Sequence, residues 1–220
     1  MKLYSYWRSS AAYRVRLALA YKAVAYTTVP VHLLAGGGEQ HRAAYRALQP
    51  QGLVPALVDD DGTVLFQSLA ILEYLEERYP GPPLLPAGSR DRAFVRAFAL
   101  ALACDVHPLS NLRVLRYLED PLGADEDARG RWIRHWIGLG FEACESMIAR
   151  RGAEGPFVCG PGPTFAEVCL VPQLYNARRY GCDLSPYPGL LRADEAARAL
   201  PSFAAAVPER QPDAPAGGGA

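Results

Sequence analysis

Residues 4–19 read Tyr4-Ser5-Tyr6-Trp7-Arg8-Ser9-Ser10-Ala11-Ala12-Tyr13-Arg14-Val15-Arg16-Leu17-Ala18-Leu19, and this stretch decides the fold. The alternating residues at its start favour a β-strand, and the spacing of Ala12, Val15 and Leu19 favours an amphipathic helix. Ser9-Ser10 lies at the junction, where a side-chain hydroxyl can cap free backbone N–H groups. Because a helix N-terminus carries partial positive charge, the same hydroxyl can hold an anion such as a thiolate. The stretch predicts a strand, a turn and a capped helix, with either a plain cap or an anion site at the turn.

The residues that follow extend this start into a β-α-β-α-β-β-α order. The patterns predict strand 26–31, a flexible loop at 35–38, helix 39–48, strand 53–58, strand 63–66 and a helix that opens at Gln67-Ser68. Pro55, near the head of the third strand, suits a strand edge or a turn, and the bond before it is a candidate for the cis form. We therefore expect one domain over residues 1–80.

A proline-rich stretch at 80–86 reads as a linker, and the patterns after it are helical throughout. They predict helical segments over 90–118, with a kink near His107-Pro108, and over 126–151, and a short last helix between Pro201 and Pro208. Thr164 and Glu167 form a capping-box pattern that opens a further helix to about 180. We expect a linker at 81–89, an all-helical domain over 90–210 and a disordered tail over 211–220.

The composition excludes several classes of protein. The chain has 220 residues, and its 23 Lys and Arg balance 23 Asp and Glu, so nothing favours binding to nucleic acid or to an anionic membrane. The longest apolar run, near 97–104, is far shorter than the roughly 20 residues of a membrane span, and no signal-peptide pattern precedes the first strand. The five dispersed cysteines have no metal-site spacing and are typical of free thiols in a reducing cytoplasm. The expected location is cytoplasmic, with no metal.

The whole pattern resembles a cytosolic glutathione transferase, which implies an α+β fold with a thioredoxin-like N-terminal domain and an all-α C-terminal domain. Five motifs are similar to those of the zeta class: Ser9-Ser10 with Arg14-Val15-Arg16-Leu17-Ala18-Leu19, Leu53-Val54-Pro55-Ala56-Leu57, Gln67-Ser68-Leu69-Ala70-Ile71-Leu72-Glu73-Tyr74-Leu75-Glu76-Glu77, Cys169-Leu170-Val171-Pro172-Gln173 and Asp183-Leu184-Ser185-Pro186-Tyr187-Pro188. That class holds maleylacetoacetate isomerases and the bacterial glutathione-dependent maleylpyruvate isomerases. The resemblance runs from Met1 to about Pro212.

The resemblance implies glutathione as cofactor, with the hydroxyl of Ser9 hydrogen-bonded to its sulfur. A helix that starts at Ser68 can take the γ-glutamyl carboxylate, and the backbone of Val54 can pair with an extended tripeptide. The implied cofactor-binding residues are Ser9, Ser10, Gln40, His41, Gln51, Val54, Pro55, Gln67, Ser68, His107 and Asn111. Singly, Gln67-Ser68 would be read as a plain cap and His41 as a solvated histidine. One position departs from the family: the usual Ser-Ser-Cys here ends in Ala11.

Arginines form the second group of candidates. Each of Arg8, Arg113, Arg178 and Arg179 would, alone, be read as part of a solvated surface. The resemblance implies that they line the substrate cleft, where a dicarboxylate needs bidentate cationic partners. Arg8 directly precedes Ser9 and is expected to act in catalysis as well. The sequence leaves open which of Arg178 and Arg179 faces the substrate.

The implied activity is cis–trans isomerisation of a maleyl keto acid. A thiolate adds to the conjugated cis bond, the resulting single bond rotates, and elimination yields the fumaryl isomer with glutathione regenerated. The alternatives are a transferase that consumes glutathione by conjugation or dehalogenation, and a non-catalytic binding module. No cysteine precedes Cys104, which argues against a glutaredoxin-like reductase. A homodimer is expected, because Phe94, Phe98 and Leu102 offer more apolar surface than one monomer should cover.

Overall fold

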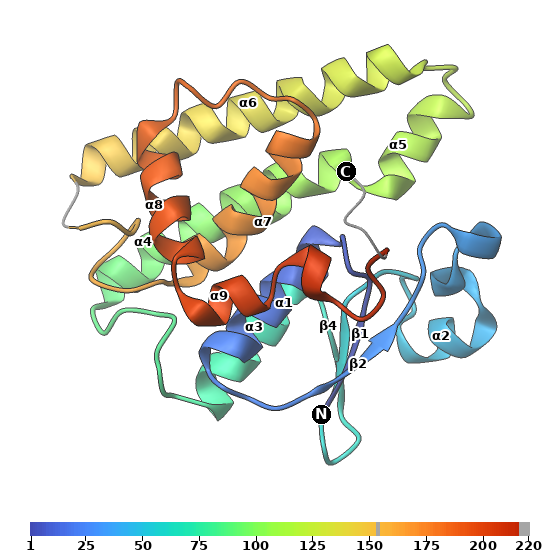
Figure 1. The fold of residues 1–220 in the computed structure, drawn as a ribbon, viewed down its shortest axis with the longest axis horizontal. Helices are drawn as coiled ribbons and strands as arrows, with labels where there is room; N and C mark the ends of the chain where they lie inside the picture. Colours follow the sequence, from blue (N-terminus) through green and yellow to red (C-terminus); the bar gives the residue numbers. More distant parts are fainter. Residues whose placement is uncertain (153–154, 216–220) are drawn as a thin grey trace. The chain divides into compact units, whose positions relative to one another are not determined.

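The computed structural model describes residues 1–152 and 155–215 (Figure 1). The chain divides into two compact units. The first contains Met1–Pro83 and the described residues from Leu200 onward, and the second contains Leu84–Ala199. The thioredoxin-like order β-α-β-α-β-β-α in the first unit, and the helical second unit, confirm the predicted α+β class.

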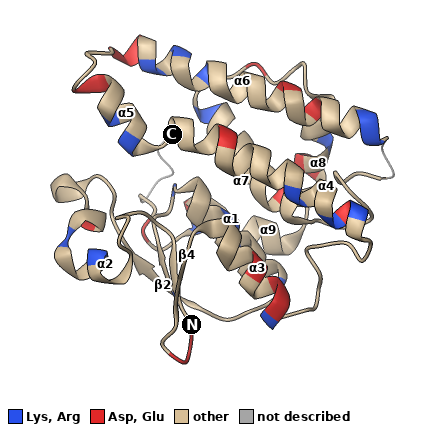
Figure 2. Cartoon of the chain, turned by 180° about the vertical axis from the view of Figure 1, so that it is seen from behind, with Lys and Arg blue, Asp and Glu red and all other residues tan. Residues whose placement is uncertain are grey.

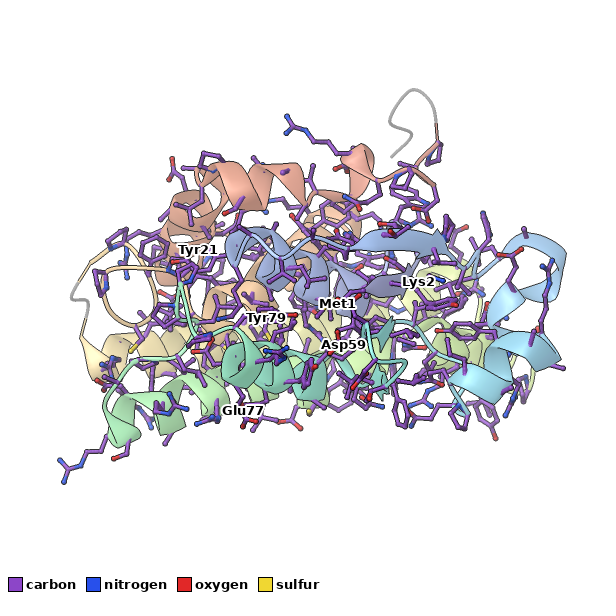
Figure 3. All side chains as sticks on the ribbon, turned by 90° about the horizontal axis from the view of Figure 1, so that it is seen from below. Met1, Lys2, Tyr21, Asp59, Glu77 and Tyr79 are labelled. Carbon is purple, nitrogen blue, oxygen red and sulfur yellow. The ribbon has the colours of Figure 1, made fainter. Side chains whose placement is uncertain are left out.

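The first unit is built on a four-stranded sheet in the order β2-β1-β3-β4. Its strands are β1 Lys2–Ser5, β2 Thr27–Pro30, β3 Ala56–Val58 and β4 Val64–Phe66. The strand β1 pairs parallel to β2 and antiparallel to β3, and β3 and β4 form an antiparallel hairpin. The chain starts at the turn of this hairpin, where the ammonium group of Met1 pairs with Asp60 and lies beside Asp59 (Figure 3).

Helices α1 Ser10–Tyr21 and α3 Ser68–Arg78 pack against each other in this unit. The residues of α1 from Ala12 to Leu19 are all buried, and Leu3 and Leu57, which face each other in the sheet, are fully buried with them. The predicted strand and helix of residues 4–19 are therefore confirmed, and the core forms around them.

Three local predictions in this unit differ from the structure. The expected helix 39–48 is two pieces, η2 Glu39–His41 and α2 Ala43–Leu48, because the extended backbone of Arg42 (ψ 141°) interrupts it. The expected flexible loop at 35–38 contains a short 3₁₀ turn, η1 Ala35–Gly37. The expected third strand is shorter and begins only at Ala56, after a cis Val54–Pro55 bond.

The second unit contains α4 Ser89–Leu100, the π-helical η3 Ala101–Val106, the 3₁₀ turn η4 His107–Ser110, α5 Leu112–Glu119, α6 Glu126–Arg151, α7 Phe165–Arg179 and α8 Pro188–Arg198. The expected single segment 90–118 is thus divided. Its helical path runs to Ser110 and breaks at Asn111, whose backbone is extended (ψ 146°). The predicted kink near Pro108 is confirmed, because η4 replaces the α-helix there.

Charges along α6 follow the helix dipole. Acidic residues occupy its first turn and arginines its last, as Figure 2 shows at the two ends of the helix. The predicted capping box of α7 is confirmed: the carboxylate of Glu167 accepts hydrogen bonds from the Thr164 backbone N–H (2.7 Å) and hydroxyl (2.9 Å). Its other oxygen accepts from the backbone N–H of Val158 at 2.6 Å.

The stretch Ser89–Glu119 is long and apolar enough, by length and composition alone, to cross a membrane. Here α4 packs against α7, and both Phe98 and Leu102 are fully buried, so the stretch serves as a core element of its unit. The sequence argument that Phe98 and Leu102 would lie uncovered on a monomer was therefore wrong. Phe94 is half-buried, and the guanidinium of Arg151 covers its ring at 4.8 Å from the centroid.

The end of the chain differs from the predicted domain layout. Residues 200–210 were expected in the helical domain, but helix α9 Pro201–Ala205 packs against α1 in the first unit. The 3₁₀ turn η5 Pro208–Arg210 follows it. Of the tail predicted to be disordered, residues 211–215 are ordered, and Asp213 accepts a hydrogen bond from the backbone of Trp7; residues 216–220 lie outside the described residues. This correction arises because the contacts that hold the tail are distant in sequence.

Candidate functional site

The turn that joins β1 to α1 carries the first site residues. The backbone N–H of Ser9 donates to the carbonyl of Tyr6 at 3.0 Å, and the Ser9 hydroxyl accepts from the Ala12 N–H at 3.2 Å. Ser9 is therefore the N-cap of α1, as predicted. The Ser9 O–H finds no acceptor in the described part of the chain, and no acidic residue occupies the first turn of α1. A half-exposed hydroxyl donor thus sits at the uncompensated positive end of a helix, beside Ser10.

Arg8 precedes Ser9 and is only partly buried. Its guanidinium lies over the ring of Trp7, 5.2 Å from the ring centroid. Within residues 1–152 and 155–215, no carboxylate forms an ion pair with it. The cation is therefore oriented by an aromatic face and has its hydrogen-bond donors left for an anionic ligand.

The N-terminus of α3 forms a second anion-binding geometry. Gln67 has a φ of 69°, a left-handed conformation that is strained for a residue with a side chain, and its side chain does not cap the helix. The hydroxyl of the buried Ser68 accepts from Arg14 at 3.1 Å. Since no acidic residue lies in the first turn, the free N–H groups of α3 remain available for a carboxylate.

The strand register brings these two helix starts to one end of the sheet. Tyr4 of β1 pairs with Ala56 of β3, and Ala56 pairs with Phe66 of β4. Because β3 runs antiparallel to the other two, the residues just beyond this row are the turn to Ser9, the Val54–Pro55 bond and the start of α3. The side chain of Val54 packs in one cluster with Tyr6 and Trp7. No described residue forms a hydrogen bond with the backbone of Val54, so it is open to an added strand.

Three of the residues expected to bind glutathione, in the loops before and after α2, differ in their surroundings. Gln51 is exposed and accepts a hydrogen bond from the Gln67 amide at 2.6 Å, which joins the two loops. Gln40 is buried and its amide contacts the Leu33 carbonyl (3.3 Å) and the His41 ring (3.1 Å). His41 is exposed, as expected of a solvated histidine.

The remaining candidates belong to the helical unit. His107 begins η4, and the side chain of Asn111 caps α5 by accepting from the backbone N–H of Arg113 at 3.1 Å. Arg113 is exposed on the first turn of α5.

The two neighbouring arginines of α7 are held differently. Arg178 donates to Asp194 of α8 at 2.6 Å, and burial raises the pKa of the Asp194 carboxyl while Arg178 opposes the shift. The guanidinium of Arg179 lies over the ring of Tyr180, 4.4 Å from its centroid. Arg178 is therefore engaged within its own unit by a buried carboxylate.

Sequence analysis missed two buried arginines of α1. Arg14 donates to Ser68, and Arg16 donates to the carbonyl of Trp7 at 2.8 Å. Burial lowers the pKa of Arg16 to about 10, which leaves it charged near neutrality. The sequence feature that could have identified them is their position on the apolar face of the opening helix, where a buried arginine needs a specific partner. Among the described residues, no group of three or more His, Cys, Asp or Glu side chains is placed to hold a metal.

The chain is similar to known proteins along most of its length. Residues 3–83 match the family model described as the glutathione S-transferase N-terminal domain. The chain is 49% identical over 212 residues to a "Probable maleylacetoacetate isomerase" of Vibrio cholerae, covering 96% of this chain and 97% of that protein. It also matches the solved holo structure of a maleylpyruvate isomerase described as a bacterial zeta-class glutathione S-transferase, with a TM-score of 0.94, 46% identity, and coverage of 98% and 100%. The chain belongs to the zeta-class glutathione transferase family.

A third relative has been solved with ligands in its active site. The solved structure of maleylacetoacetate isomerase from Anaeromyxobacter dehalogenans contains dicarboxyethyl glutathione and citrate in its active site. It is 48% identical to this zeta-class chain, with a TM-score of 0.84 and coverage of 97% of each chain. In that relative, the ligand is a glutathione that carries a dicarboxylic group.

Proposed function

We propose that this protein is a glutathione-dependent cis–trans isomerase of a maleyl keto acid in the breakdown of aromatic compounds. It would convert maleylpyruvate to fumarylpyruvate or maleylacetoacetate to fumarylacetoacetate. The observation that carries the proposal is the Ser9 hydroxyl, free to donate at the uncompensated N-terminus of α1, in a chain similar along its length to isomerases of both acids.

The residues of the first unit fit glutathione in three ways. The uncapped start of α3, at Gln67 and Ser68, suits the γ-glutamyl carboxylate. The open backbone beside Pro55 suits the extended peptide, and the loop that carries Gln51 extends toward Gln67. The hydroxyl of Ser9, supported by the neighbouring N–H of Ser10, suits the sulfur. We expect Gln40 to support its loop, and His41 to contribute little.

Bound glutathione supplies a thiolate that adds reversibly to a conjugated double bond. The role of Ser9 is to donate a hydrogen bond toward the sulfur, so that the thiolate form is favoured near neutral pH. The dipole of α1 acts in the same direction. Ala11 stands where relatives of this class often have cysteine, so the thiolate here depends on the hydroxyl and the helix alone.

Arg8 is proposed to hold the negative charge that develops on the keto oxygen and to bind a carboxylate. Its guanidinium is preoriented over Trp7 and carries no ion pair within the described residues. In the helical unit we propose Arg113 and Arg179 as further partners of the dicarboxylate. Arg178 is the weaker candidate, because Asp194 already holds its guanidinium. His107 and Asn111 are proposed to assist cofactor binding, although the amide oxygen of Asn111 is engaged as the cap of α5.

The same site could serve a transferase that consumes glutathione, since Ser9 activates the thiolate whatever the electrophile. A homodimer and a cytoplasmic location are also part of the proposal, with no nucleic acid or membrane as partner. We propose to incubate the purified protein with maleylpyruvate and with maleylacetoacetate, with and without glutathione. Glutathione-dependent formation of a fumaryl product supports the proposal, and failure to isomerise either acid refutes it.

A further inference from the structure

The turn that presents Arg8 and Ser9 is held from both sides at one residue, Trp7. The backbone N–H of Trp7 donates to a carboxylate oxygen of Asp213 at 2.8 Å. The carbonyl of Trp7 accepts from the guanidinium of Arg16 at 2.8 Å. An anion and a cation thus fix the same residue, which is the second of the four residues in the turn closed by Ser9 and Tyr6. Neither charged group has a role in the chemistry proposed above.

Arg16 connects this turn to the C-terminal segment. Its side chain is fully buried, and it donates to the Ser5 hydroxyl at 3.1 Å and to the carbonyl of Ala206 at 3.2 Å. A buried guanidinium is stable only when its donors are satisfied, and here the acceptors come from the end of β1 and from the residue after α9. The cation therefore orders both segments together.

Asp213 approaches from the tail, 206 residues away in sequence from Trp7. The next residue, Ala214, packs on the cluster that contains Tyr6, Trp7 and Val54. The second carboxylate oxygen of Asp213 is buried and has no hydrogen-bond partner in the described part of the chain. A buried carboxylate oxygen without a hydrogen bond costs free energy unless another interaction compensates for it. Here the positive charge of Arg16 attracts the negative charge of Asp213. The tail is thus held against the turn by specific contacts.

We propose that Asp213 is a positioning residue for the turn over residues 6–9, which presents Ser9 to the glutathione sulfur. It acts through the backbone N–H of Trp7, together with Arg16, which binds the carbonyl of the same residue. Arg8 and Ser9 are the third and fourth residues of that turn, so the backbone conformation of Trp7 sets where both side chains begin. Loss of the Asp213 contact leaves the backbone N–H of Trp7 without its acceptor, so that the turn can shift and the Ser9 hydroxyl no longer points toward the sulfur. The inference rests on the proposed role of Ser9 in thiol activation.

The test compares the full-length variants Asp213→Ala and Asp213→Asn with a control, Asp127→Ala, which removes an exposed carboxylate from α6. The first readout needs no ligand: amide hydrogen exchange of the peptide that contains residues 6–9 is expected to be faster in Asp213→Ala. In Asp213→Asn the amide oxygen still accepts from Trp7, so exchange is expected to stay near that of the unaltered protein. The control is expected to leave this peptide unchanged.

The second readout is the pKa of the bound glutathione thiol, followed by thiolate absorbance against pH. In Asp213→Ala this pKa is expected to rise and kcat to fall about tenfold, the size of one charge-assisted hydrogen bond, while glutathione affinity changes less than about twofold. Asp213→Asn is expected to recover most of the kcat and most of the lowered thiol pKa.

Unchanged exchange at residues 6–9, or an unchanged thiol pKa, in Asp213→Ala overturns the proposal and leaves the tail as a packing contact. An Asp213→Asn variant as impaired as Asp213→Ala also overturns it, because the hydrogen-bond acceptor would then not be what matters. Failure of the proposed function is recognised separately: the unaltered protein would then fail to lower the thiol pKa of bound glutathione.

Discussion

The hydroxyl of Ser9 has two separable tasks at the scale of the single residue: it caps α1 and it points a donor at the sulfur. Ser9→Ala is expected to lower kcat tenfold or more, about the value of one lost charge-assisted hydrogen bond, and to leave glutathione affinity nearly unchanged. Loss of the cap should cost about 1 kcal/mol of stability. Steady-state kinetics and urea unfolding measure the two effects. Ser9→Thr keeps the hydroxyl and should recover part of the activity; full turnover in Ser9→Ala would exclude the assignment.

The two arginines at the end of α7 offer a matched pair of substitutions. Arg178→Met removes the closer of the two arginines that pair with Asp194, at 2.6 Å against 3.7 Å for Arg198. The Asp194 side chain is only 1% exposed against 39% for Arg178. We expect a loss of about 1–3 kcal/mol in the free energy of unfolding and little change in KM, with the partial exposure of Arg178 keeping the cost below that of a fully buried pair. Arg179→Met is expected to raise KM for the dicarboxylate and to cost less stability than Arg178→Met, because its guanidinium lies over Tyr180. The opposite pattern of effects would assign the substrate to Arg178.

At the scale of the secondary-structure element, the capping box at the start of α7 is held by several hydrogen bonds to one buried carboxylate. The Glu167 carboxylate accepts three hydrogen bonds, from Val158 and Thr164, while fully buried. Glu167→Gln replaces one acceptor oxygen by an amide that faces donors, so we expect a loss of about 2–3 kcal/mol near pH 5. Thermal or urea unfolding checks it. Ser146→Ala, on the exposed face of α6, is a control expected to unfold like the unaltered protein.

This loss should depend on pH with a defined sign. Burial raises the pKa of Glu167 above its ordinary 4.5. The folded state then binds the proton more tightly than the unfolded chain, so the stabilisation from this group falls as the pH rises from 4.5 through the raised pKa. The glutamine variant lacks that titration. The difference in unfolding free energy between the two proteins should therefore narrow as the pH rises above 4.5 through the raised pKa, and a widening difference would contradict the assigned cause.

Elements with local determinants could be predicted from the sequence, and those with distant determinants could not. The Ser9 cap and the Thr164–Glu167 box are set within four residues, and both were predicted correctly. Helix α8 was not predicted, because its first N–H groups are capped by Glu145 of α6, about 45 residues earlier in the chain. The prediction of a disordered tail was wrong for residues 211–215 for the same reason, because Asp213 binds Trp7 near the opposite end of the sequence.

At the scale of the whole molecule, the candidate site could be predicted only in part. The motifs marked the residues that the sheet register gathers at one end, Ser9, Val54 and Ser68. The buried contacts that support them, from Arg14, Arg16 and Asp213, join residues 54, 190 and 206 apart in sequence. No local sequence pattern reveals such partners. Each arginine fits its helix by propensity alone, so its neighbours in sequence do not indicate which distant residue it binds.

The proposed homodimer finds better support in the structure than in the residues first considered for it. Along α4 and η3, exposed apolar side chains recur at helical spacing, at Ala93, Ala97, Leu100 and Cys104. A charge in this row should prevent association, so Leu100→Glu is expected to be monomeric at micromolar concentration by light scattering. Leu139→Glu, at a similarly exposed leucine of α6, is the control and should remain dimeric. A monomeric unaltered protein would exclude the dimer.

The balance of free thiol over a complete reaction separates a catalyst from a consumer of glutathione. In isomerisation the carbon–sulfur bond forms and breaks within one cycle, so free thiol should stay constant while the cis keto acid disappears. In conjugation, thiol falls mole for mole with substrate. Substitution of Arg8 addresses the same question. Its guanidinium forms no ion pair with the described residues and lies next to Ser9, where it can bind the substrate. Arg8→Met should slow isomerisation by at least tenfold if it holds the developing charge, with glutathione affinity little changed. Thiol titration and product analysis on both proteins decide the matter: steady thiol consumption, with Arg8→Met fully active on the maleyl acids, would make a general glutathione transferase the better description of this site.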